Sequence, residues 1–202
     1  MPSDSTRWRS LAQTLVLYGA ALALGVGSAW WVLKKAPWFN NTVQVGAWRA
    51  NLLAGSPNAD LYTRAALALN ALLALDRSET MYFVATQDDS GHALRSRCSY
   101  RVEGTPPNAR WWSITAYADD MFLFDAPQQR YSLNGSTAQL DAQGHFALTT
   151  GATPVPGVHW LPTTPGDRGL VLTLRLYNPL PAMQEQPASL AAPRITALGA
   201  CP

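Results

Sequence analysis

The sequence predicts a mainly β, α+β protein: a jelly-roll-like β-sandwich with one soluble helix, preceded by a single N-terminal transmembrane helix. Three observations lead to this prediction. One apolar segment of 23 residues carries no charge, later segments alternate apolar and polar residues, and 15 prolines and eight tryptophans are spread through the 202 residues. Aromatic residues favour pleated sheets and proline interrupts helices, so a helical bundle is disfavoured.

The apolar segment, Leu11–Leu33, is long enough as a helix to cross a hydrocarbon core of about 30 Å. Basic residues flank it and aromatic residues lie at its end, which is typical of membrane interfaces. These flanking residues are Arg7, Arg9, Trp30, Trp31, Lys34 and Lys35. We therefore expect Leu11–Leu33 to bind the membrane as a single-pass anchor that follows a short tail, residues 1–10.

Small residues in this segment support two further interpretations. Gly27-Ser28-Ala29 offers a signal-peptidase site, which would make the segment a cleaved signal peptide. Gly19, Ala23 and Gly27 recur every four residues, a spacing that lets two helices approach closely as a homodimer. An anchor and a signal peptide both lead to export of the remaining chain.

Two cysteines bear on the compartment, because the basic residues balance across the span and do not set its orientation. A disulfide between Cys98, in a predicted strand, and Cys201 would tie the C-terminal tail to the sheet in an oxidising compartment. Closing a loop of this length would stabilise the fold by about 4 to 5 kcal/mol. The alternative is two unpaired thiols. The disulfide favours a cytoplasmic tail and a C-terminal domain on the other side.

Residues 34–58 contain several prolines and glycines and predict a linker, with an edge strand where Val43 and Val45 alternate. The β-rich domain is predicted to occupy residues 59–202. Asp60 can cap a helix at its start, and apolar residues at helical spacing extend this helix from Leu61 to Leu75.

From residue 80 the apolar period changes to two, which indicates strands. We expect six to nine short strands, the clearest being Thr80–Thr86, Leu94–Glu103, Trp111–Ala118, Met121–Phe124, Tyr131–Leu133 and Leu170–Tyr177. The first two strands should form a hairpin across the turn Asp88–Gly91. Asp119-Asp120 predicts a second turn, Asn134-Gly135 a tight hairpin, and Gly144 another short pair of strands.

Four segments occur in a distinctive order: RWWSITAYADD (110–120), RYSLNG (130–135), HWLP (159–162) and LTLRLYNP (172–179). Together they resemble the domain-of-unknown-function 1214 (DUF1214) family over roughly residues 75 to 180. The resemblance implies a β-rich, jelly-roll-like domain of bacterial origin and of the short, membrane-anchored type. The expected location is therefore the bacterial inner membrane, with the domain in the periplasm. No catalytic assignment comes with the resemblance.

Catalytic and metal-binding motifs are not recognisable in the sequence. It contains no G-x-S-x-G string, and its histidines, which lack ligand spacing, are interpreted as loop or packing residues: His92, His145 and His159. Asp88-Asp89 and Asp119-Asp120 fall in predicted turns, where aspartate bonds to local backbone. The net charge of +2 is spread along the chain, so no nucleic-acid interface is expected. We predict no cofactor.

The best candidate for a binding surface is one face of the predicted sheet. If the leucines and Trp112, Ile114 and Ala116 point inward, the alternate residues form an outer face of aromatic rings and arginines. Such a face suits stacking on sugar rings and bidentate binding of carboxylate or phosphate. The predicted ligand-binding residues are Arg97, Arg101, Trp111, Tyr117, Arg130, Tyr131, Arg175 and Tyr177. The alternative is a solvated or covered face whose arginines pair with Glu79 and Glu103.

The leading functional hypothesis is a non-catalytic envelope module that binds an anionic or sugar-like ligand, or a protein partner. The first alternative is a hydrolase acting on a carbohydrate or ester, with Glu79 or Glu103 as acid or base beside Arg101. Its geometric support would be two carboxyls about 5 to 9 Å apart in a cleft. The second alternative is a structural interaction protein, which a lack of pockets on both sheet faces would favour.

Overall fold

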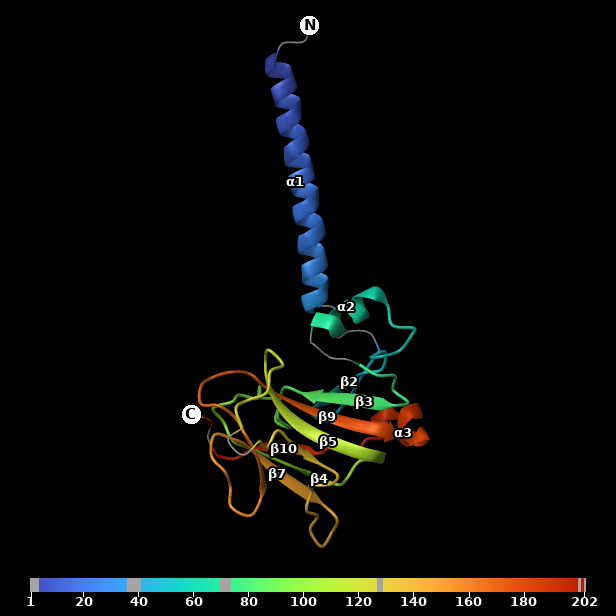
Figure 1. Cartoon of the computed structure of the whole chain (residues 1–202), viewed down its shortest axis with the longest axis vertical. Coiled ribbons are helices and arrows are strands. Elements are labelled where there is room, and N and C mark those ends of the chain that lie inside the picture. Colours follow the sequence, from blue (N-terminus) through green and yellow to red (C-terminus); the bar gives the residue numbers. More distant parts are fainter. Residues whose placement is uncertain (1–3, 36–40, 70–73, 127–128, 200, 202) are drawn as a thin grey trace. The chain divides into compact units, whose positions relative to one another are not determined.

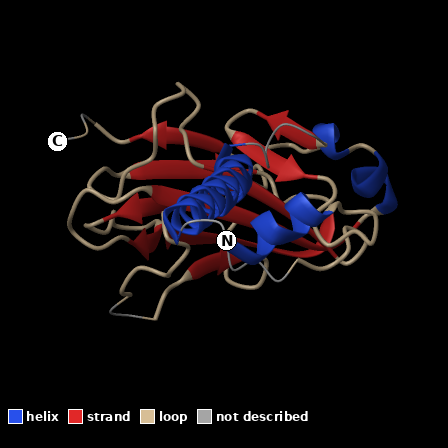
Figure 2. Ribbon diagram, turned by 90° about the horizontal axis from the view of Figure 1, so that it is seen from above, coloured by secondary structure: helices blue, strands red, loops and turns tan. Residues whose placement is uncertain are grey.

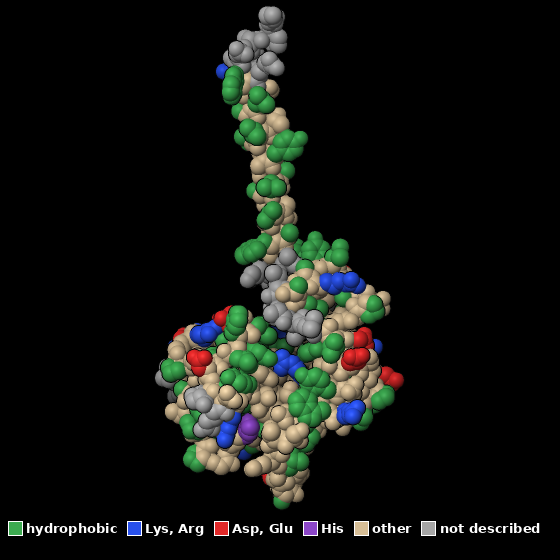
Figure 3. Space-filling model, in the orientation of Figure 1, with side chains coloured by type: hydrophobic (Ala, Val, Ile, Leu, Met, Phe, Trp, Pro, Cys, Tyr) green, Lys and Arg blue, Asp and Glu red, His purple; other side chains and the backbone are tan. Residues whose placement is uncertain are grey.

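The computed structural model describes residues 4–35, 41–69, 74–126, 129–199 and 201, and the chain divides into two compact units, 1–39 and 40–202. The described residues of the first unit form one helix, α1 (Asp4–Lys35). Its segment Trp8–Val32 is long and apolar enough to cross a membrane, and Figure 3 shows hydrophobic side chains along its exposed length. A signal sequence has the same properties, so anchor and signal peptide both stay predictions.

Strands are the main regular elements of the second unit (Figures 1 and 2). An antiparallel six-stranded sheet has the order β1-β2-β3-β9-β5-β6, formed by Thr42–Val45, Trp48–Asn51, Thr80–Ala85, Leu170–Pro179, Ala109–Ala118 and Ser132–Asn134. A four-stranded sheet has the order β10-β4-β7-β8, formed by Arg194–Ala197, Tyr100–Gly104, Phe146–Gly151 and His159–Pro162. In the second sheet β7 and β8 are parallel, and the other pairs are antiparallel.

The two sheets share one hydrophobic core. Trp112 of β5 lies against Phe146 of β7, with ring centroids 4.6 Å apart, and so joins the two layers. Strand β9 pairs with β3 on one side and β5 on the other, and its alternate leucines are buried as the period of two predicts. These leucines are Leu170, Leu172, Leu174 and Leu176. The mainly β, α+β fold is confirmed, whereas the jelly-roll path stays a prediction.

Helix α2 (Leu61–Leu69) begins where the sequence predicts, because Asp60 caps it. The Asp60 Oδ1 atom accepts a hydrogen bond from the Thr63 backbone N–H at 2.9 Å, which satisfies one free donor of the first turn. The predicted helix continues to residue 75, but residues 70–73 lie outside the described part and residues 74–75 are not helical. Two short elements, α3 (Pro181–Glu185) and the 3-10 helix η1 (Pro187–Ser189), follow β9 and precede β10.

The segment 34–58 contributes more of the sheet than the sequence pattern indicated. Within the segment 34–58, which we expected to be a linker, Val43 and Val45 lie in the edge strand β1 as predicted. The next strand, β2, was not predicted. It buries Trp48, whose indole Nε1 donates a hydrogen bond to the Pro193 carbonyl at 2.7 Å.

The predicted hairpin between Thr80–Thr86 and Leu94–Glu103 is present only at its turn, where Leu94 donates its N–H to the Thr86 carbonyl at 2.9 Å. The rest of the pairing is wrong, because β3 and β4 belong to different sheets. The chain crosses between the sheets just before β4. There Ser96 donates its N–H to the Arg168 carbonyl at 2.8 Å and Leu94 accepts one from Leu170 at 3.0 Å. The predicted inward side of this segment is nevertheless buried, at Leu94, Cys98, Tyr100 and Val102. The alternation identified the side facing the core, but not the neighbouring strand.

The turns show one correction and two confirmations. Asn134-Gly135 forms no hairpin with positive φ angles; instead the Asn134 side chain accepts hydrogen bonds from the backbone of Ser136 and Thr137. The aspartate pairs lie in turns as predicted. Asp88 accepts N–H bonds from Ser90 and His92, both at 2.9 Å, and Asp120 accepts one from Phe122 at 3.1 Å.

Candidate functional site

The predicted ligand-binding face is divided among separate parts of the domain. Four of its residues lie together on the outer side of the six-stranded sheet, on β5 and β9: Trp111, Tyr117, Arg175 and Tyr177. Arg97 lies in the crossover before β4, and Arg101 lies on β4 in the other sheet. Arg130 and Tyr131 precede β6. The predicted set is therefore not one surface.

On the six-stranded sheet the aromatic residues and the arginine contact one another. The Trp111 and Tyr177 rings lie 5.1 Å apart, and Arg175 lies over the Tyr117 ring at 5.4 Å. Arg175 also donates hydrogen bonds to the Tyr117 hydroxyl at 2.8 Å and the Thr115 hydroxyl at 3.2 Å. These bonds use part of the donor capacity that a ligand would need. We call Trp111, Tyr117, Arg175 and Tyr177 the aromatic face.

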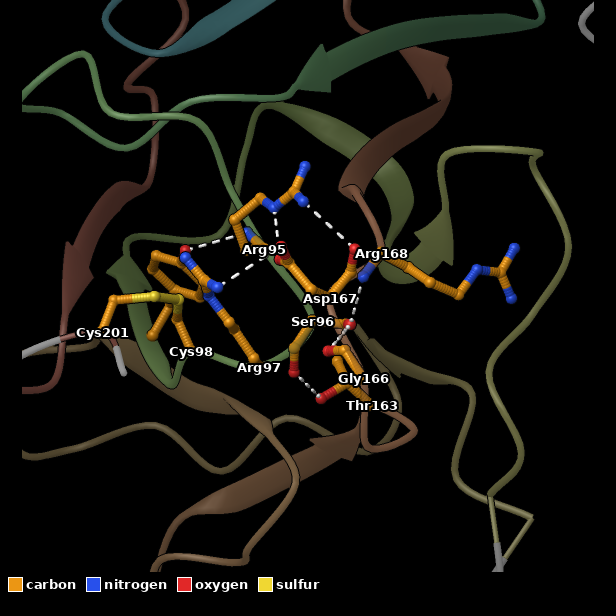
Figure 4. Close-up of a disulfide and its surroundings, with 10 residues drawn as sticks. Arg95, Ser96, Arg97, Cys98, Thr163, Gly166, Asp167, Arg168 and Cys201 are labelled. Carbon is orange, nitrogen blue, oxygen red and sulfur yellow. Dashed lines mark hydrogen bonds and ion pairs between the residues drawn. A yellow bond between two sulfur atoms is a disulfide. The ribbon is translucent and has the colours of Figure 1, made fainter.

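Arg97 belongs to a structural cluster around the disulfide (Figure 4). Its Nη1 atom lies 3.3 Å from Asp167, whose other oxygen accepts a hydrogen bond from Arg95 Nε at 2.6 Å. The Arg95 hydrogen bond is the main reason why the pKa of Asp167 lies below its ordinary value. The neighbouring Cys98 forms the predicted disulfide with Cys201, so the alternative of two unpaired thiols is wrong. Arg97 therefore holds two segments of the fold together.

Arg101 and Arg130 both line a cavity of about 1020 Å³, a size typical of small-molecule sites. One wall consists of outward-facing residues of the four-stranded sheet, including Arg101, Glu103 and Arg194. The rest of the lining comes from the segments that precede β6, β7 and β8 and from the first residues of β7 and β8. Its charged and imidazole-bearing residues are Arg130, Asp141, His145 and His159.

Most charged groups in this cavity already have a partner. Arg101 Nε donates to Glu103 Oε2 at 2.6 Å, and Arg194 Nε lies 3.9 Å from Asp89. Asp141 accepts backbone N–H bonds from His145 at 2.8 Å and Gln143 at 2.9 Å, which hold the pKa of its carboxyl below the ordinary value. In the part of the chain that the structure describes, Arg130 has no carboxylate within 4.0 Å.

His159, at the start of β8, has a buried Nε2 atom without a hydrogen-bond partner in the described residues. Burial lowers the pKa of this imidazole, the charge of Arg130 lowers it further, and a hydrogen bond to the Ser132 backbone acts in the opposite direction. A neutral imidazole and a guanidinium without a carboxylate partner among the described residues thus line the same cavity. Because the Nε2 atom is buried, the exposed Arg130 guanidinium is the candidate for ligand contact.

The sequence interpretation missed His159, His145, Asp141 and Arg194 as cavity residues. A signal was nevertheless present, because two of the four family-like segments contribute to the cavity: RYSLNG supplies Arg130 and HWLP supplies His159. Of the carboxylates named for a hydrolase, Glu103 lines the cavity and Glu79 does not. Among the described residues, no three His, Cys, Asp or Glu side chains group as a metal site.

Residues 79–181 match the family model described as a protein of unknown function (DUF1214). The chain belongs to this family. This agrees with the resemblance given by the four segments, and the matched region of the DUF1214 domain runs from β3 to the start of α3. No curated protein matches the chain in sequence.

Two solved structures resemble the DUF1214 domain. The VPA0106 protein from Vibrio parahaemolyticus has a TM-score of 0.56 and 21% identity over 68% of this chain and 35% of that protein. An uncharacterised protein from Burkholderia cenocepacia has a TM-score of 0.48 and 17% identity over 65% of this chain and 32% of its own. This chain thus spans about a third of the length of those proteins. At this identity, the similarity to the Vibrio protein shows a shared fold.

Proposed function

We propose that the DUF1214 domain binds a small anionic ligand in the cavity beside β4. The observation that carries this proposal is Arg130, which lines the cavity and lacks a carboxylate partner among the described residues. A guanidinium presents a planar fork of donors that matches a carboxylate or phosphate in a bidentate geometry. An anion would therefore satisfy donors that the protein leaves free.

The charge balance of the cavity favours the same class of ligand. Three arginines line it, and the carboxylates that line it are Glu103 and Asp141. Because the pKa of His159 is lowered by burial, this side chain adds no positive charge near neutral pH. The lining therefore carries a net positive charge, and Arg130 has no neutralising carboxylate among the residues that the structure describes.

We also propose that the domain lies in the bacterial periplasm, where α1 anchors it to the inner membrane. Two observations support it: α1 is long and apolar enough to cross a bilayer, and Cys98 and Cys201 form a disulfide. Disulfides persist in oxidising compartments such as the periplasm and are rare in the cytosol. A binding domain anchored in this way would meet its ligand within the cell envelope.

The aromatic face is a second candidate surface, for a sugar-like ligand or a protein partner. Trp111 is 37% exposed and lies against Tyr177, so a partly open indole is available for stacking. Arg175 is less available, because Tyr117 and Thr115 already accept two of its hydrogen bonds. We therefore rank this surface below the cavity.

Replacing one arginine at a time distinguishes the two surfaces. The full chain in lipid nanodiscs would be titrated with D-galacturonate, phosphate and acetate by isothermal calorimetry. We expect Arg130→Gln to weaken binding of the best anion by about ten-fold or more, since a hydrogen bond to a charged group contributes about 1.5–3 kcal/mol. Arg175→Gln is the matched control on the aromatic face and should leave affinity unchanged. Loss of binding in the control alone would move the site to that face.

A hydrolase remains the alternative function, because Glu103 and Asp141 line the same cavity. The interactions that Glu103 and Asp141 already make argue against a hydrolase. Glu103 is already paired with Arg101. The pKa of Asp141 is lowered, so this carboxyl is ionised near neutral pH and has no proton to donate as a general acid. Turnover of a nitrophenyl glycoside or ester by the wild type, lost in Glu103→Gln, would favour the hydrolase over the binding module.

A further inference from the structure

Helix α2 turns an apolar face outward. Leu61 at its start is 82% exposed, Tyr62 is 56% exposed, and Ala68, two turns after Leu61, is exposed as well. The side chain that α2 buries is instead the polar Thr63. A helix on the surface of a soluble domain has the reverse arrangement, with its apolar stripe against the core. We call Leu61, Tyr62 and Ala68 the α2 face, which the described part of the domain leaves uncovered.

The segments on both sides of α2 are fixed near the point where the chain enters the domain. The Asn41 carbonyl, just before β1, accepts a hydrogen bond from the Leu52 N–H at 2.8 Å, and Leu52 begins the segment that leads to α2. Beyond α2, the Leu75 carbonyl lies so close to Gly55 in this segment that a Cβ atom at Gly55 would overlap it. Figure 1 shows α2 beyond β2 and β3, away from the four-stranded sheet. The α2 face thus belongs to the entry side of the domain.

The connection that leads to this side is short. Residues 36–41 separate the end of α1 from the start of β1, so the Cα atoms of Lys35 and Thr42 lie at most about 25 Å apart in any conformation. With Trp8–Val32 across a bilayer, the entry side of the domain stays close to the membrane surface. A short tether also raises the local concentration of α2 at that surface, so a small apolar contact suffices for binding.

We propose that the α2 face binds the surface of the phospholipid bilayer that α1 spans. Leu61 then lies at the boundary between headgroups and acyl chains, and Tyr62 lies at headgroup level, where an aromatic ring with a polar end is favoured. Helix α2 has no carboxylate to repel lipid phosphates, and its one charged residue is the exposed Arg64. The inference rests on the proposed anchoring through α1 and is independent of the anion site.

Lipid quenching in the full chain tests this contact. Leu61→Cys would be labelled with an environment-sensitive fluorophore, since the native cysteines are held in their disulfide. The nanodiscs would contain phosphatidylcholine and phosphatidylglycerol, with and without a phosphatidylcholine that carries a nitroxide near the headgroup end of its acyl chain. Leu140→Cys is the matched control, at an exposed leucine that pairs with the start of β7 in the other sheet.

We expect the nitroxide to quench the probe at position 61 at least about three-fold more than the probe at position 140, because an interfacial helix inserts about 5–10 Å into this boundary. A second pair of variants keeps the probe at one place, in labelled Ala68→Cys. Adding Leu61→Glu should reduce its quenching by about three-fold or more, because a carboxylate is costly to bury among acyl chains. Adding Leu180→Glu, at an exposed leucine between β9 and α3, should leave the quenching unchanged.

The outcomes separate the inference from the anchor on which it rests. If alkaline carbonate releases the chain from native membranes, α1 is no anchor, and the proposed location fails together with the inference. If the chain resists extraction but the two probes are quenched equally, the anchor stands and the inference is wrong. Emission at position 61 that shifts to shorter wavelength without nitroxide quenching would assign the α2 face to a protein surface, such as a second copy of this chain, and would also overturn the inference.

Discussion

At the residue scale, the role of each arginine is decided by the carboxylate that the fold brings to it. Arg97 contacts Asp167, 70 positions further along the chain, whereas Arg101 contacts Glu103 on its own strand. Arg130 has neither kind of partner in the described part of the chain. The sequence shows the same residue type in all three places. The sequence could therefore suggest arginines as anion-binding candidates, but it could not show that Arg130 is the one of these three without a carboxylate partner in the described residues.

His159 leads to a pH-dependent prediction at this scale. Because burial and Arg130 lower its pKa, the unfolded chain takes up this proton at a higher pH than the folded domain does. The stability of the fold should therefore fall as the pH drops from about 6.5 towards the folded pKa. We expect His159→Gln to reduce this fall, as measured by urea unfolding at several pH values between 7.5 and 5.

The control for this prediction is His92→Gln, because the His92 side chain is 83% exposed. Its unfolding profile should follow that of the wild type. Carboxyls with lowered pKa, such as Asp120 and Asp141, lose their contribution only in more acidic solution, since their ordinary value is 3.8. Their effect is thus separate from that of the histidine. Parallel profiles for wild type and His159→Gln would show that the imidazole is not held neutral by burial.

At the element scale, the period of two predicts strands well but does not predict their pairing. The strands β3, β5 and β9 and the burial of their core-facing residues follow directly from the pattern, but the outward-facing Ser113, Thr115 and Thr173 are buried as well. Pairing depends on contacts between distant segments: β10 joins β4 across about 90 residues, and no local signal marks it. For this reason the predicted hairpin extends no further than the pair Thr86 and Leu94. Because this pairing was not predicted, residues that we expected on one face, such as Arg101 and Arg175, lie on different sheets.

Strand β9 is the element on which the six-stranded sheet depends. Leu174 is fully buried between β3 and β5 neighbours. We expect Leu174→Ala to lower the free energy of unfolding by about 2–5 kcal/mol, because the change leaves a cavity in a packed core. Leu180→Ala, at a side chain that is 52% exposed, is the matched control and should change stability by less than about 0.5 kcal/mol. Equal losses in denaturant unfolding would contradict the central role of β9.

At the scale of the whole molecule, the sequence predicted the apolar helix, the sandwich and the disulfide, but not the cavity. The helix follows from a local run of residues, and the disulfide follows because the described residues contain just two cysteines, Cys98 and Cys201. The cavity is different, since its walls come from segments spread between residues 101 and 194. A site of this kind exists only once both sheets are packed. Only its family-like segments, with Arg130 and His159, are visible beforehand.

The disulfide stabilises the whole domain, because it ties the C-terminal segment to the crossover between the two sheets. Cys98 and Cys201 are 103 residues apart in sequence, with Cα atoms 4.9 Å apart. In the chain-entropy model, closing a loop of about 100 residues stabilises the fold by about 4 to 5 kcal/mol. We expect Cys201→Ser to remove most of this amount in denaturant unfolding. The double variant Cys98→Ser/Cys201→Ser should behave like the single one, since the stabilisation requires both sulfurs.

The same bond tests where the domain resides. In intact cells, a membrane-impermeant thiol reagent should leave both cysteines of the wild type unlabelled but should label Cys98→Ser at Cys201, which is exposed. Labelling of that variant requires that Cys201 lies outside the cytoplasm, because the reagent does not cross the inner membrane. If Cys201 reacts only after the cells are lysed, the domain is cytoplasmic and the disulfide has no oxidising compartment in which to persist.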